Sequence, residues 1–158
     1  MLQPRVEPEI AVILEHTVDP GATRSQAHAA VREAHAALEV VDSIWRDYRF
    51  HIEDNTADGS SAAYVVLGPR LGTDELDGVD VVLAVDGAEV AGGAGAAAMG
   101  HPLDALCWLA TELADQGKQL RAGDLVITGG LTAAWPLRAG GRVSAVFGGG
   151  VRVSVGRG

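Results

Sequence analysis

The sequence of 158 residues contains one cysteine, and it has neither a long apolar run nor an excess of basic residues. Because Cys107 stands alone, no disulfide can form within the chain, which fits a reducing cytoplasm. The small-residue stretch 90–99 is too short and too rich in glycine to cross a bilayer. The N-terminus lacks a basic segment followed by an apolar one, so no signal peptide is expected.

Positive charge is scarce. Lys and Arg together number 12 against 21 Asp and Glu, which gives a formal net charge of -9 at pH 7. A surface of this sign repels phosphate backbones and argues against a nucleic-acid partner. An acidic chain still binds an anionic substrate where a cation or a local positive group is present, so the composition directs attention to a bound metal ion.

The remaining composition is that of a folded domain. Hydrophobic residues make up 47% and charged residues 21%, and the length suits a single domain spanning residues 1–158. Short apolar runs between turn residues predict strands at 10–14, 37–42, 63–67, 125–128, 143–147 and 151–155. The stretch 79–90 predicts a hairpin that turns at Asp86-Gly87.

A first helix is expected to begin near Thr23 or Ser25, since either residue can cap it. Its apolar face is expected to consist of the helically spaced residues Ala27, Ala30, Val31, Ala34 and Leu38. His28 and His35 then fall on its solvated side.

A second helix is expected to open at His101-Pro102, with proline at its first position, and to end at Gly117. Many short strands combined with two main helices predict an α+β fold built on a mixed, barrel-like β-roll.

Two glutamates lie at the start of the first strand. Glu7 and Glu9 are two residues apart, so their side chains point to the same face of a strand. Two close carboxylates repel each other, and a divalent cation relieves the repulsion. The pair alone fits an exposed acidic strand end equally well.

Glu39 interrupts an apolar run, residues 37–41, that is otherwise typical of a buried strand. A buried carboxylate without a partner costs several kcal/mol, so it requires an arginine, a proton or a metal ion. Three carboxylates without histidine or cysteine form a hard oxygen set, which suits Mg²⁺, Mn²⁺ or Ca²⁺ better than zinc.

The stretch 2–11, which contains Pro4-Arg5-Val6-Glu7 and Glu9-Ile10-Ala11, resembles the PR-(I/V)-E-x-E-I-A segment of the 2-keto-4-pentenoate hydratases and 4-oxalocrotonate decarboxylases. These enzymes belong to the fumarylacetoacetate hydrolase superfamily. Similar signatures follow in the same order at 37–43, 56–61, 100–103 and 121–129. The resemblance implies a fold of the fumarylacetoacetate hydrolase C-terminal domain type.

The resemblance also implies a function. Glu7, Glu9 and Glu39 match the family's magnesium ligands, with Mn²⁺ as a second option, and Ser61 matches a serine beside the substrate. Arg5 lies in the same motif and is assigned to substrate binding. The implied activity is that of a lyase, a hydratase or decarboxylase, on a 2-oxo acid or 2-hydroxy-dienoate through a metal-stabilised enolate.

The family pattern is not matched in one respect. Family members carry an earlier Gly-x-Lys-x-Gly segment whose lysine lines the active site, and this sequence begins after it. Its only lysine, Lys118, lies in a polar loop. The proton-transfer role is therefore assigned to the stretch 46–61, with Asp58, Asp54 and His51 as the candidate catalytic residues.

Two alternatives follow from the same departure. One is a shortened scaffold reused as a cyclase or isomerase in a biosynthetic pathway, with tryptophans lining an apolar pocket. The other is a metal-binding subunit that needs a partner chain to supply the lysine. Because many strand edges are expected to be exposed, the sequence also predicts a homo-oligomer built from dimers.

Overall fold

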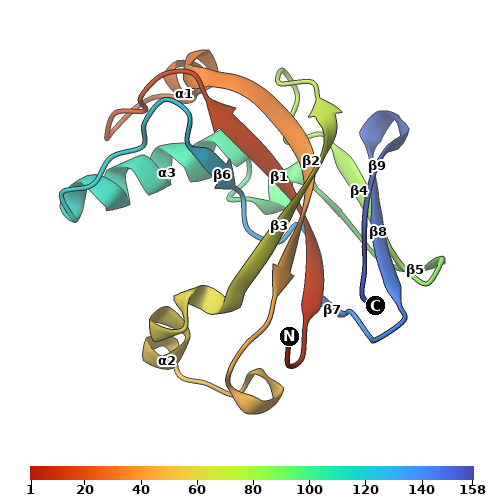
Figure 1. The fold of residues 1–158 in the computed structure, drawn as a ribbon. Helices are drawn as coiled ribbons and strands as arrows, with labels where there is room; N and C mark the ends of the chain where they lie inside the picture. Colours follow the sequence, from red (N-terminus) through yellow and green to blue (C-terminus); the bar gives the residue numbers. More distant parts are fainter.

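The computed structural model describes all residues from Met1 to Gly158 and contains two antiparallel sheets (Figure 1). The first sheet has five strands in the order β3-β2-β1-β6, and β7 also pairs with β1. Its strands are β1 (Arg5–Leu14), β2 (Val31–Val41), β3 (Ala62–Leu71), β6 (Leu125–Ile127) and β7 (Trp135–Pro136). The second sheet has the order β5-β4-β8-β9, with β4 (Asp80–Val85), β5 (Ala88–Ala94), β8 (Arg142–Phe147) and β9 (Val151–Gly156).

Three α-helices lie at the ends of the first sheet. They are α1 (Arg24–Ala30), α2 (Ile52–Ala57) and α3 (Pro102–Asp115), and single 3₁₀ turns occupy Arg46–Tyr48, Gly59–Ser61, Gly95–Ala97 and Gly148–Gly150. In Figure 1, α1 and α3 lie together at the end near β6, and α2 lies at the opposite end near the N-terminus. None of these helices is long and apolar enough to span a bilayer.

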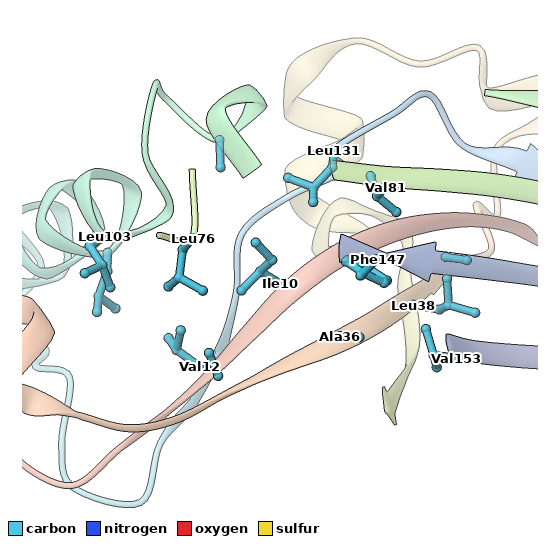
Figure 2. Close-up of a cluster of buried hydrophobic side chains, with 14 of the residues drawn as sticks. Ile10, Val12, Ala36, Leu38, Leu76, Val81, Leu103, Leu131, Phe147 and Val153 are labelled. Carbon is cyan, nitrogen blue, oxygen red and sulfur yellow. The ribbon is translucent and has the colours of Figure 1, made fainter. Parts of the chain in front are cut away.

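The core lies between the two sheets, as Figure 2 shows for Ile10 and Leu38 of the first sheet facing Phe147 and Val153 of the second. Alternation along a strand sends successive side chains to opposite faces. Ile10 and Leu38 are fully buried on the inner face, so their neighbours Glu9 and Glu39 lie on the outer face of the same sheet. The pattern that builds the core therefore also places the acidic residues.

The predicted α+β class and β-roll are confirmed, although every strand pairing is antiparallel rather than mixed. The hairpin at Asp86-Gly87 is confirmed, and so is the helix that opens at His101-Pro102, where the His101 Nδ1 accepts from the Leu103 amide. The two-residue strand β7 was not predicted, because two residues carry no periodicity.

The extent of the first helix was predicted wrongly. Thr23 caps α1 through a capping box with Gln26, as expected, but the helix ends at Ala30 and β2 begins at the next residue. Ala34 and Leu38, assigned to a helix face, lie on the inner face of β2. Because pairing with β1 extends along nearly all of β2, tertiary pairing overrides the local alanine-rich helical spacing.

His35 was placed on a solvated helix surface, and the structure corrects this as well. It lies in β2, where only 8% of its surface is exposed. Its Nδ1 lies 2.9 Å from the Gly68 carbonyl oxygen, and its Nε2 lies 2.8 Å from Glu33 Oε2. The Nδ1 contact therefore connects β2 to β3, whereas the Nε2 contact stays within β2.

Gly95 provides a test of the packing between the 3₁₀ turn and the core. A Cβ at this position would lie 1.8 Å from the carbonyl oxygen of the buried Leu76. We expect Gly95→Ala to lower the free energy of unfolding by about 3 kcal/mol, since backbone must move to relieve such overpacking. Gly72→Ala is the matched control, because nothing lies within 4 Å of a Cβ there. Equal urea midpoints for the two variants would contradict this account.

Candidate metal centre

Three glutamates converge on the outer face of the first sheet. Glu7 and Glu9 are two residues apart on β1, and Glu39 of β2 is paired directly with Glu7. One carboxylate oxygen from each residue lies within 4.8 Å of the others. None of the three takes part in an ion pair with an arginine, lysine or histidine. The expected convergence is therefore present, and arginine is not the partner of Glu39.

Glu9 is the most enclosed of the three, with 0% of its surface exposed. Its Oε2 accepts a hydrogen bond of 2.7 Å from the Gly129 amide. Its Oε1 is the one buried side-chain polar atom of the chain that has no hydrogen-bond partner. A buried oxygen without a partner is expensive, so this atom fits a ligand to a cation.

The electrostatics of the cluster favour proton or metal binding. Burial, reinforced by the neighbouring Glu39 carboxylate, raises the pKa of Glu7 from 4.5 to about 7 and that of Glu9 to about 9. The Gly129 amide opposes this change at Glu9. Without a cation the cluster therefore holds protons at neutral pH, whereas a divalent ion would stabilise the ionised carboxylates.

The segment after β6 forms one side of the cluster. It continues to bond to β1, because the Thr128 amide donates to the Ile10 carbonyl and the Leu131 amide donates to that of Pro8. Between these contacts, a Cβ on Gly130 would lie 2.3 Å from Glu7 Oε2. Glycine at this position thus leaves the space that the Glu7 carboxylate fills.

Gly129 and Gly130 were not identified as site residues from the sequence. The available signal was the Gly129-Gly130 pair directly after the predicted strand 125–128, which is also typical of an ordinary turn. Their role depends on the alignment of this segment beside β1, which is a long-range contact without a local pattern.

Arg5 lies on the same side of β1 as Glu7, two residues earlier. It is half-buried, and its guanidinium carbon lies 4.2 Å from the centre of the Tyr48 ring. It also lines a hollow of 240 Å³ together with Arg138 and Arg157. The predicted substrate-binding residue is therefore near the cluster, and its role remains a prediction.

Ser61 and Asp58 are brought together at the start of β3. Ser61 is buried, and its hydroxyl donates to Asp58 Oδ2 over 3.1 Å. The same oxygen accepts from the Ile44 amide at 3.3 Å. Ser60 and Ser61 both have φ near +60°, a conformation that costs free energy for residues other than glycine and is frequent at functional sites.

Asp54 and His51 are not part of the glutamate cluster and lie at the start of α2. The Asp54 carboxylate accepts from the His51 amide at 3.1 Å and completes a capping arrangement. This is a structural use of Asp54 that the sequence-based assignment did not include. The catalytic role assigned to the two residues remains a prediction.

Comparisons with known proteins agree with this geometry. Residues 1–155 match the family model described as fumarylacetoacetate (FAA) hydrolase C-terminal. A 2-keto-4-pentenoate hydratase of Burkholderia vietnamiensis is 40% identical over 149 residues, which cover 92% of this chain and 57% of that protein. A 4-oxalocrotonate decarboxylase of a Pseudomonas species is 37% identical over 140 residues, which cover 88% of this chain and 55% of that protein.

The solved structures include a protein of nearly the same fold. The 4-oxalocrotonate decarboxylase of Pseudomonas putida G7, complexed with magnesium and adipate, superposes with a TM-score of 0.93 at 32% identity. The superposition covers 99% of this chain and 61% of that one. This chain therefore spans somewhat more than half the length of the relatives it matches.

The space at Gly130 gives a direct test of the centre. We expect Gly130→Ala to weaken Mn²⁺ or Mg²⁺ binding at least about tenfold, because the added methyl group displaces Glu7, and changes around metal ligands typically cost 10–100-fold in affinity. Titration calorimetry measures the effect. Gly92→Ala, whose Cβ would meet only ordinary contacts, serves as the control. Unchanged affinity in Gly130→Ala would contradict the account that the space at Gly130 is needed for metal binding.

The raised pKa values predict how stability depends on pH in the metal-free protein. Between pH 5 and 9 the folded chain holds protons at Glu7 and Glu9 that the unfolded chain has released. The free energy of unfolding therefore falls as pH rises through this range, by on the order of a few kcal/mol. We expect Glu9→Gln to flatten the slope in urea unfolding, and the exposed Glu15→Gln to leave it as in the parent protein. Parallel slopes for all three would refute the prediction.

Proposed function

Because the chain belongs to the fumarylacetoacetate hydrolase family, we propose that it is a magnesium-dependent lyase, a hydratase or decarboxylase acting on a 2-oxo acid or 2-hydroxy-dienoate. The observation that carries the proposal is the cluster of Glu7, Glu9 and Glu39, in which a buried oxygen of Glu9 has no partner. The names of the relatives, and the magnesium in one of their structures, support the same reading.

The donor set fits magnesium. Three carboxylate oxygens are hard ligands, and they leave coordination positions for water and for a bidentate substrate. Glu7, Glu9 and Glu39 would hold the cation, which would supply Lewis-acid stabilisation of negative charge on a bound 2-oxo acid. In this chain the Gly129 amide orients Glu9, and Gly130 leaves room for Glu7.

For proton transfer we favour Asp58 among the three candidates. It contacts the buried hydroxyl of Ser61, whose strained backbone holds it at the start of β3. The Asp54 carboxylate instead accepts from the His51 amide in the cap of α2. Arg5 is proposed to contact the substrate from the same face as the glutamates.

The proposal is tested by measuring turnover of 2-hydroxypenta-2,4-dienoate in the presence of Mg²⁺. The loss of the substrate's ultraviolet absorbance reports the turnover. We expect Glu9→Gln to reduce magnesium affinity by more than about 100-fold and to remove turnover, because losing a ligand exceeds the usual cost of a change around one. Glu15→Gln is the control, since it makes the same chemical change at an exposed position. Metal-independent turnover, or full activity in Glu9→Gln, would overturn the proposal.

A second candidate is a metal-binding subunit that acts with a partner chain, and a third is a reused scaffold. If the chain is such a subunit, it binds magnesium with the expected affinity when purified, and turnover appears only after a partner is added.

We also propose that the protein is a cytoplasmic homo-oligomer built from dimers. The outer edge of β3 pairs with no strand of the chain, and Tyr64 on this strand is 62% exposed. Exposed edges of this length are usually covered by association. Light scattering on the purified chain measures the assembly directly.

A further inference from the structure

Two rows of paired residues cross the outer face of the first sheet. One row runs Glu7, Glu39 and Val65 across β1, β2 and β3, and the next runs Glu9, Ala37 and Leu67. Paired residues project to the same face, and neighbouring strands are about 4.8 Å apart. Val65 and Leu67 therefore lie immediately beside the metal centre, on the side opposite Gly129 and Gly130.

These two side chains are exposed although they are apolar. Val65 is 41% exposed and Leu67 is 42% exposed, whereas Val66 between them packs against the core. Ala37, which separates Leu67 from Glu9, is fully buried. The path from the cluster to the apolar surface therefore runs through Glu39, whose direct neighbour is the exposed Val65, and continues to Leu67 on the same face.

This part of β3 also lacks charge. Its first charged residue is Arg70, whose guanidinium is held by Glu33 Oε2 at 2.8 Å. A carboxylate placed over Val65 and Leu67 would lose hydration and find no cation to replace it. Hydrocarbon placed there would instead be removed from water together with the two side chains.

We propose that Val65 and Leu67 form an apolar subsite for the substrate's hydrocarbon chain, so that the protein selects 2-oxo acids with an uncharged tail over those with a second carboxylate. The inference rests on the proposed function and narrows its substrate class. It assigns specificity to β3, a strand that contributes no metal ligand.

The substrate's tail could also extend along β1 towards Arg5 instead of across β3. It belongs to the neighbouring row, with Val41 and Ala62, and its guanidinium lies over the Tyr48 ring. A dicarboxylate whose tail pointed along β1 would approach this cation. The subsite on β3 is the nearer of the two, because Val65 is the direct cross-strand neighbour of the ligand Glu39.

The test measures binding of a homologous series to the magnesium-loaded protein. The probes are pyruvate, 2-oxobutyrate, 2-oxopentanoate, 2-oxohexanoate and the dicarboxylate 2-oxoadipate. We expect affinity to rise about two- to fourfold for each added methylene, the upper value corresponding to full burial, and 2-oxoadipate to bind more weakly than 2-oxohexanoate. Val65→Thr and Leu67→Ser should bring the ratio of the 2-oxohexanoate and pyruvate affinities towards one. Val82→Thr, at a valine of the second sheet that is 37% exposed, should keep the parental ratio.

The outcomes separate this inference from the proposed function. If pyruvate shows no magnesium-dependent binding, the proposed function fails and the subsite fails with it. If pyruvate binds but affinity is flat along the series, only the subsite is overturned. The same holds if 2-oxoadipate binds more tightly than 2-oxohexanoate and Arg5→Gln removes that advantage.

Discussion

The register between β1 and β2 is the constraint on which the site depends. Glu7 meets Glu39 across the two strands, and Glu9 lies on the same face one step along. A slip of one residue would send one strand's side chains to the other face and separate the carboxylates. The register is held by the inner face of the sheet, where Ile10, Leu38 and their neighbours fill the core. Hydrophobic packing on this face therefore holds the three carboxylates close together despite their mutual repulsion.

The groups around the cluster compensate only part of the repulsion between the carboxylates. The Gly129 amide stabilises one oxygen of Glu9, and no basic side chain neutralises the remainder. Had an arginine been paired with Glu39, the site would be complete as an ion pair and would offer little to a metal ion. The cluster is instead left with protons or a cation as its only means of compensation, which is the condition that a metal centre requires.

The convergence of the three glutamates could be predicted from local patterns. Glu39 lies inside an apolar run, and Glu7 and Glu9 share a strand face, so periodicity and the cost of buried charge indicated a common site. Their assignment as magnesium ligands came from the family resemblance and stays a prediction. The limits of the first helix could not be obtained in this way, because alanine-rich stretches fit both a helix and a strand, and only the pairing of β2 with β1 decides between them. The space left by Gly130, the partner of Glu9 and the exposed face of β3 all depend on segments distant in sequence, which local patterns do not reveal.

The arrangement of the strands also explains how different parts of the site can serve different purposes. All three carboxylates come from two adjacent strands of one sheet, and the 129–130 turn forms one side of the cluster. The candidate proton-transfer residues lie in the connection between β2 and β3, where Asp47, Tyr48, Ser60 and Ser61 all have positive φ. The proposed substrate contacts fall on β3, whose side chains on the outer face carry no part of the core. Changes on β3 can therefore alter specificity while the register of β1 and β2 continues to hold the ligands.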